Sequence, residues 1–111
     1  MFPQTERART SEAISILSAI RQGEEAFFLE NGNYMAAVAA DADAVWNQIG
    51  MDDPNDISVY FGYAVAIGNP ATTFTATATR TAVNDGGGNV GTTVTLDETG
   101  TFGGTHPFVP T

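Results

Sequence analysis

Hydrophobic residues recur with a helical period over residues 10–34, TSEAISILSAIRQGEEAFFLENGNY. Asn31 and Gly32 tolerate a positive φ, which suits the position just past a last helical turn. The pattern therefore predicts an amphipathic helix over about residues 4–31, with one face that another layer must cover. When successive residues are placed about 100° apart, that face carries Ala13, Ile16, Leu17, Ile20, Gly23, Phe27 and Phe28.

The sequence allows two starting points for this helix. Thr10 or Ser11 can cap a first turn, with Glu12 placed where the helix dipole favours a negative charge. The helix can also begin as early as Pro3, because residues 6–9 are all acceptable helix formers.

One acidic residue interrupts the apolar stripe. Glu24 lies between Ile20 and Phe27, where an uncompensated buried charge would be costly. The favoured interpretation places Glu24 at the edge of the sheet, where its long side chain reaches water or accepts hydrogen bonds from strand or loop amides. The alternative is that Glu24 locks the loop after the helix, with Gly23 permitting close backbone approach or a slight bend.

The period changes from helical to alternating after residues 52–56, DDPND, which form a turn by composition. Strands are predicted over residues 57–67, from about Thr73 to Arg80, and over about residues 91–97, with a hairpin loop at residues 84–89. Threonines face outward on the second strand. The inward positions are Val59, Phe61, Tyr63, Val65, Ile67, Phe74, Ala76, Ala78, Arg80, Val94 and Leu96.

Together these segments predict an α+β fold, in which the N-terminal amphipathic helix packs on a three- to four-stranded antiparallel β-meander. A single domain is expected over residues 1–111, with a variable loop at 32–56, the β-meander at 57–98 and a C-terminal tail at 99–111. In the variable loop, the side chains expected to be buried are Val38, Val45, Trp46 and Ile49. In the tail, they are Phe102, Phe108 and Val109.

Charge and composition exclude several functions. The chain has four arginines, no lysine and 13 acidic residues, and its net charge of -9 argues against binding to nucleic acid or to anionic lipid. It has no cysteine, which excludes a disulfide framework, a thiolate zinc site and a cysteine nucleophile. No apolar run approaches the ~20 residues that span a bilayer.

Candidate chemistry is sparse. His106 is the single histidine, and beside Pro107 it is expected to be an exposed loop residue without metal partners. The loop GGGNVG lies between two strands and lacks the lysine of a phosphate-binding loop. No Ser-His-Asp set can be assembled, so we expect neither enzymatic activity nor a catalytic residue.

Two acidic loops remain as alternatives for metal binding. Asp52, Asp53, Asn55 and Asp56 could offer oxygen ligands to calcium, as could Asp85 with loop carbonyls. Neither loop has the EF-hand spacing with its terminal glutamate. We therefore predict no cofactor and keep calcium as an alternative.

Five segments form a specific combination: ARTSEA at residues 8–13, ILSAIRQGEEAFFLENGNY at 16–34, YFGY at 60–63, FTATATR at 74–80 and LDETGTFGG at 96–104. Together they resemble the globular domain of type IV pilins and of the pseudopilins of type II secretion. The resemblance covers nearly the whole chain. Its best single signature is EAFFLENGNY at residues 25–34, following SEA at residues 11–13.

The resemblance implies one long helix, whose apolar N-terminal half anchors the precursor in the inner membrane and later packs in the filament core. This sequence lacks the processing site, the Phe-Thr-Leu-Ile-Glu opening, the apolar half-helix and the C-terminal disulfide loop of many pilins. Pro3 resembles the proline near the end of the apolar half. About twenty residues, the length of a bilayer span, are therefore expected to have been removed or to be supplied by a separate chain.

The resemblance also implies a structural subunit of a type IV pilus or pilus-like filament, with identical or related subunits as partners and an extracellular or cell-surface location. A periplasmic pseudopilin or a minor pilin is the alternative from the same machinery. A free-standing acidic module that binds calcium or a surface ligand is the alternative from another class. In a filament, Glu6, Arg7 and Arg9 would lie at the neck between core and outer domains, although an ordinary solvated helix start explains these charges equally well.

Overall fold

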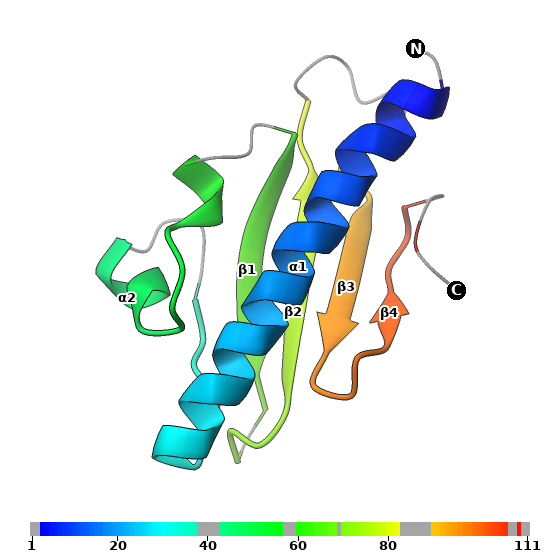
Figure 1. Cartoon of the computed structure of the whole chain (residues 1–111). Helices are drawn as coiled ribbons and strands as arrows, with labels where there is room; N and C mark the ends of the chain where they lie inside the picture. The colour runs from blue at the N-terminus through cyan, green and yellow to red at the C-terminus, as the bar shows by residue number, and fades with distance from the viewer. Residues whose placement is uncertain are drawn as a thin grey trace.

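The computed structural model describes residues 3–37, 43–56, 60–68, 70–82, 90–106 and 109. A four-stranded antiparallel sheet of order β1-β2-β3-β4 is crossed on one face by a long helix (Figure 1). The predicted α+β fold, a helix on an antiparallel meander, is confirmed. The elements are α1 (Pro3–Asn31), α2 (Asp43–Asn47), the 3-10 helix η1 (Pro54–Asp56), β1 (Phe61–Ile67), β2 (Phe74–Arg80), β3 (Thr93–Asp97) and β4 (Phe102–Gly103).

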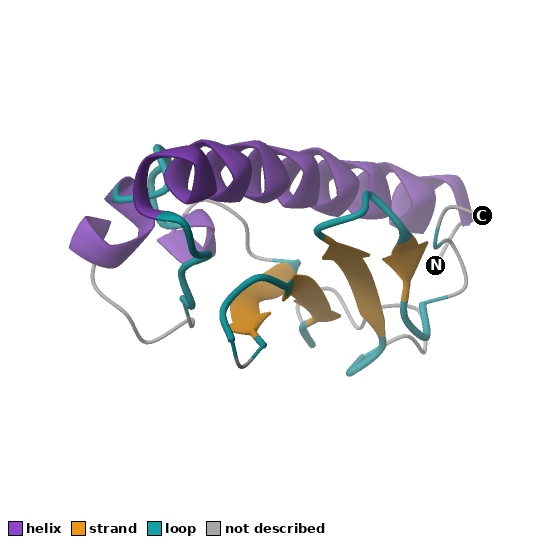
Figure 2. Ribbon diagram, turned by 90° about the horizontal axis from the view of Figure 1, so that it is seen from below, coloured by secondary structure: helices purple, strands orange, loops and turns teal. Residues whose placement is uncertain are grey.

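The molecule has two layers. Figure 2 shows α1 along one side and the strands along the other, with the short α2 at one flank of the helix layer. Side chains from the inward stripe of α1 and from alternate strand positions fill the space between the layers, as the two periods predict. The buried hydrophobic residues are Ala13, Leu17, Ile20, Tyr34, Ala37, Trp46, Ile49, Phe61, Tyr63, Val65, Phe74, Ala76, Ala78, Val94 and Leu96.

The stripe predicted for α1 faces the sheet. Ala13, Leu17 and Ile20 are fully buried, and Ile16, Phe27 and Phe28 are half-buried against the core. Among the inward strand positions, Ile67 departs from the prediction because it ends β1 and is 39% exposed. Val59 and Val38 lie outside the described residues.

Both ends of α1 agree with a prediction. The helix begins at Pro3, the earlier of the two predicted starts, so the alternative start with Thr10 or Ser11 as the cap is wrong. Thr10 is buried within the helix, and the Ser11 hydroxyl donates 3.0 Å to the carbonyl of Arg7 in the preceding turn. The predicted stop is confirmed: Gly32 has a φ of 78° and its amide donates 2.7 Å to the carbonyl of Phe28.

The outer edge of β1 is covered. The backbone of Ala37 exchanges two hydrogen bonds with Val65, of 3.1 and 2.6 Å. Next to it, the Asn55 side chain accepts 2.7 Å from the Tyr63 amide and donates 3.2 Å to the Tyr63 carbonyl. An uncovered edge is a template for pairing with other chains, and residues from the loop between α1 and β1 block that pairing here.

The tail continues the sheet. Phe102 and Gly103 pair with β3 as the short strand β4, and Phe102 and Val109 pack against the core, whereas Phe108 lies outside the described residues. The turn before β4 is organised by Asp97. Its Oδ1 accepts from the Thr99 hydroxyl at 2.6 Å and from the Thr101 amide at 3.1 Å, and these hydrogen bonds hold the pKa of Asp97 below its ordinary value.

Candidate assembly surface

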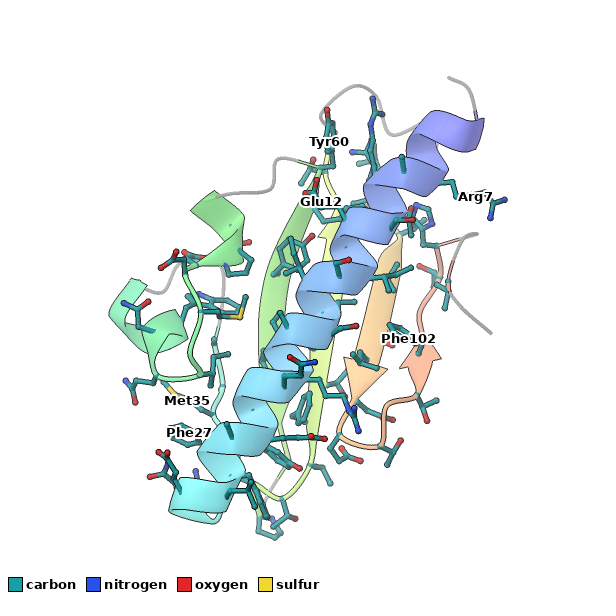
Figure 3. All side chains as sticks on the ribbon, viewed as in Figure 1. Arg7, Glu12, Phe27, Met35, Tyr60 and Phe102 are labelled. Atoms are coloured by element: carbon teal, nitrogen blue, oxygen red, sulfur yellow. The ribbon has the colours of Figure 1, made fainter. Side chains whose placement is uncertain are left out.

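The amino-terminal end of α1 carries the predicted subunit contacts. Arg7 is exposed, and Figure 3 shows it pointing away from the sheet. Arg9 is half-buried, with its guanidinium carbon 4.5 Å from the centroid of the Tyr60 ring, a cation–π arrangement. The side chain of Glu6 lies outside the described part of the helix. Of the three predicted contacts, the structure therefore shows Arg7 at an exposed position and Arg9 against an aromatic ring.

A third arginine, Arg80, lies near this end of the helix, beside the same Tyr60 ring. Arg80 is 1% exposed, and its guanidinium donates to the carbonyls of Tyr60 at 3.2 Å and Thr81 at 2.9 Å. Its guanidinium carbon is 5.4 Å from the centroid of the Tyr60 ring, which therefore has two arginines around it. The strand pattern placed Arg80 on the inward face but did not identify it as a buried charge. The sequence did contain one clue: Arg80 is the last inward-facing position of β2, after Phe74, Ala76 and Ala78.

His106 is buried, and the expectation of an exposed loop histidine is wrong. Only 3% of the residue is exposed, its Nε2 lies 3.4 Å from the Thr10 hydroxyl, and its ring centroid is 5.8 Å from that of Phe61. The reason is that the tail turns back across the sheet, where the His106 amide donates 2.9 Å to the carbonyl of Thr93. His106 thereby joins the tail to the underside of α1.

The side chain of Glu24, a residue of α1, contacts the loop that follows the helix. The residue is fully buried, so the expectation that it reaches water is wrong. Its Oε1 accepts 2.8 Å from the Met35 amide, so the loop amide named in the favoured interpretation is its partner. The same hydrogen bond agrees with the alternative that Glu24 locks the loop after the helix. Burial raises the pKa of the Glu24 carboxyl from 4.5 to about 7, and the hydrogen bond from Met35 opposes this rise.

Gly23 makes the close approach that the sequence indicated. A Cβ atom at this position would overlap the carbonyl oxygen of Ile49, in the turn after α2. Ile49 is buried, as is Trp46 one turn earlier. The segment around α2 is therefore held against the helix at the one position of α1 that has no side chain.

Two side chains of the acidic loop at residues 52–56, Asp53 and Asn55, bind each other. Asp53 is buried, and its Oδ1 accepts from both the backbone amide and the side-chain amide of Asn55, each at 2.9 Å. Over the described ranges, no group of three or more His, Cys, Asp or Glu is arranged to hold a metal ion. Asp85 lies outside those ranges, and calcium binding stays an expectation.

The carboxyl end of α1 has a different character from the amino end. Leu29 is 87% exposed beside a hollow of about 220 Å³, which is lined by Glu25, Phe28, Leu29 and Tyr34. The Tyr34 ring contacts Phe28 and Phe74, with ring centroids 4.7 and 4.8 Å apart. Burial and the nearby carboxylates raise the pKa of Tyr34.

A second hollow, of about 260 Å³, lies between α1 and the turn that precedes β4. Arg21 lines it, with its guanidinium close to Gly100 and paired with Glu25 at 3.0 Å. The remaining lining residues are Ser18, Gln22, Leu96 and Phe102.

The structure is therefore a long helix laid across an antiparallel meander, with charged turns at its amino end and a buried acid that ties down the following loop. The comparison with known families agrees: residues 6–106 match the Pilin family, described as the pilin of a bacterial filament. The chain belongs to this family. No curated protein and no solved structure matches the chain.

Membership of the family confirms the resemblance found in the sequence. The chain is a structural subunit of a pilus, its family is structural rather than enzymatic, and pilins assemble with other pilin subunits into filaments at the cell surface. Among the helices that the structure describes, none is long and apolar enough to cross a membrane.

Proposed function

We propose that this chain is the globular domain of a type IV pilin, which assembles through an apolar helical segment in line with the amino-terminal end of α1. The observation that carries the proposal is a helix longer than the sheet beneath it. The 29 residues of α1 rise about 43 Å, whereas the seven-residue strands β1 and β2 span about 23 Å. In Figure 1 the first turns of α1 extend past the upper end of β3.

We further propose that Glu6, Arg7 and Arg9 contact neighbouring subunits. Two of these residues carry positive charge in a chain whose net charge is -9, so they provide attraction between copies that otherwise repel. The contact of Arg9 with Tyr60 limits the freedom of its side chain before any subunit binds. A side chain that is already oriented loses less conformational entropy on assembly.

A pseudopilin or minor pilin is the second candidate. One observation favours it: the tail is held by the pairing of β4 with β3, by the Asp97 turn and by buried His106, without a cysteine anywhere in the sequence. Many pilins secure this region with a disulfide loop. Deleting the gene separates the two candidates, because loss of a pilin removes surface filaments, whereas loss of a pseudopilin blocks protein export.

The proposal is tested by expressing the natural precursor with its assembly genes and examining sheared cell-surface material by electron microscopy with antibodies raised against the folded domain. We expect filaments that bind the antibody along their length. Arg7→Ala and Arg9→Ala should lower the filament yield, whereas Ser15→Ala, at an exposed position of the same helix, should not. Release of the domain only as a monomer, with the assembly genes present, would refute the proposal.

A further inference from the structure

We propose that Glu24 is a proton-operated latch on residues 35–37, which cover part of the outer edge of β1. We call these three residues the cover segment. When Glu24 is protonated, the cover segment stays closed. When Glu24 is ionised, the segment opens locally while the sheet stays folded. The inference concerns the folded domain itself, so it goes beyond the proposed role in a filament and is tested without one.

The cover segment links Glu24 to the strand edge over a short stretch of chain. After α1 the chain turns back and runs beside β1 (Figure 1). The Met35 amide donates 2.8 Å to the Glu24 Oε1, and two residues later Ala37 exchanges two hydrogen bonds with Val65. Within the described residues, those two bonds form an isolated bridge outside the named strands. Release of Met35 therefore loosens a segment whose hold on β1 is one bridge long.

Tyr34 is the fixed point from which the cover segment moves. Its amide donates 2.8 Å to the carbonyl of Ala71, and its ring contacts Phe28 and Phe74. None of these contacts involves Glu24 or the edge of β1. Opening of the cover segment therefore leaves the helix end and the start of the loop in place.

The closed segment leaves an ionised Glu24 poorly compensated. The residue is fully buried, and its Oε2 has no hydrogen-bond partner within the described residues. An ionised carboxylate without water or a positive partner is costly. The charged and titratable side chains on the described elements around it are Arg21 and Glu25 on α1, Tyr34 in the loop, Asp52 and Asp53 after α2, and Glu98 before β4. Arg21, the one cation in this set, is paired with Glu25 at 3.0 Å.

Proton linkage sets the direction of the switch. Burial raises the pKa of the Glu24 carboxyl from 4.5 to about 7 in the closed state, whereas a Glu24 exposed by opening has its ordinary value. The closed state therefore binds more protons, and its advantage is present below pH 4.5 and lost as the pH rises through 7. Opening frees the amide and carbonyl of Val65, which makes this part of the edge available for pairing with another strand.

Native-state hydrogen exchange of this 111-residue chain tests the latch. The reporters are the amides of Ala37 and Val65, and the reference is the Arg80 amide, which donates to the Thr92 carbonyl away from the cover segment. After correction for intrinsic exchange, protection at the reporters should fall roughly thirtyfold between pH 5 and pH 7. It should hardly change with low urea, because local opening exposes little surface. Protection at Arg80 should be higher and should fall steeply with urea, because its exchange requires unfolding of the sheet.

Glu24→Gln and Glu25→Gln form a matched pair of variants. Glutamine at position 24 keeps an acceptor for the Met35 amide and does not titrate, so the reporters should lose their dependence on pH. Glu25 is the neighbouring acid and is exposed, so Glu25→Gln should keep the thirtyfold change. A pH dependence that persists in Glu24→Gln would overturn the inference. So would equal urea dependence at Val65 and Arg80 in the wild type, a result that needs no variant and means that the cover segment opens only when the whole domain unfolds.

Discussion

The Glu24 Oε1 atom accepts a 2.8 Å hydrogen bond from the amide of Met35, and this contact ties the last third of α1 to the loop that follows the helix. The other carboxylate oxygen, Oε2, has no partner within the described residues. A buried carboxyl with one satisfied oxygen is more stable protonated than charged. The fold therefore contains an acid whose protonation favours the native state.

Because Glu24 is more stable protonated in the folded chain, we expect the free energy of unfolding to fall as the pH rises. The carboxyl has a pKa of about 7 in the folded chain, above its ordinary value of 4.5. The folded state therefore binds more protons than the unfolded state between these values, and the stabilisation present below pH 4.5 is lost as the pH passes 7. At ~1.4 kcal/mol per pKa unit, the loss is about 3 kcal/mol. Urea unfolding from pH 4 to pH 8.5 measures it.

Glu24→Gln is the matching control. The glutamine keeps an oxygen that can accept from Met35, but it does not titrate, so this variant should be more stable than the wild type above pH 7. Other acids near the loop, including Glu25 and Glu98, are unchanged and cancel in the comparison. A difference between wild type and variant that is constant with pH would contradict the role assigned to Glu24.

Gly23→Ala should destabilise the protein, although alanine is the better helix former. The added Cβ overlaps the Ile49 carbonyl, so the segment around α2 must move away from the helix. Overpacking of this kind costs roughly 1–3 kcal/mol, more than the gain of up to ~1 kcal/mol in helix propensity. Thermal melting measures the net effect, and tryptophan fluorescence should change because Trp46 lies in the displaced segment.

Ser15→Ala makes the control for this substitution. Ser15 is exposed on α1, so its replacement tests helix propensity without a new contact. We expect its melting temperature to stay within about a degree or two of the wild type, or to rise slightly. Stabilisation by Gly23→Ala would show that the turn after α2 is not held by close packing.

The parts of the fold that follow from local periods could be predicted from the sequence. The stripe containing Leu17 and Ile20 needed only the spacing of apolar residues, and the inward positions of β2 and β3 needed only their alternation. Gly32 could be predicted as the helix stop because a residue with positive φ is needed there. These features depend on neighbours within one or two turns of the chain.

The errors lie where a contact joins distant parts of the chain. Thr10 has the sequence signature of a cap, yet it is an interior residue of α1. Its side chain contacts His106, which is 96 residues away in the sequence. The same contact buries the histidine, which a Gly- and Pro-rich tail gave no reason to expect. For Glu24, the pattern identified an unusual residue, but only the path of the following loop decides that the Met35 amide reaches it.

Asn55→Asp should open the edge of β1. The Asn55 oxygen accepts from the Tyr63 amide, and its nitrogen donates to the Tyr63 carbonyl and to Asp53 Oδ1, so a carboxylate keeps the first bond and repels both acceptors. Loss of these half-buried side-chain bonds together with the repulsion should cost about 1–3 kcal/mol. Hydrogen exchange at the Tyr63 amide should change less than in Asn55→Ala, which removes both bonds to Tyr63. Equal protection in all three proteins would contradict the edge role of Asn55.

His106→Ala should release the tail from the helix. The substitution removes the ring packed near Phe61 and the contact with the Thr10 hydroxyl, at a site where only 3% of the residue is exposed. Removing a buried ring and a buried polar contact should lower the free energy of unfolding by about 2–3 kcal/mol. Limited proteolysis should then cut the chain after β4 faster than in the wild type.

A double-mutant cycle with Thr10→Val separates the hydrogen bond from the packing. Valine keeps the shape of the threonine side chain and removes only its hydroxyl, so Thr10→Val alone should cost about 1 kcal/mol. If the hydroxyl stabilises the fold through its contact with His106, Thr10→Val should cost less stability in the His106→Ala background than in the wild type. The coupling energy between the two substitutions should then be at least ~0.5 kcal/mol. Additive losses would assign the buried histidine a packing role alone, because the 3.4 Å approach of its Nε2 to Thr10 would then contribute nothing measurable.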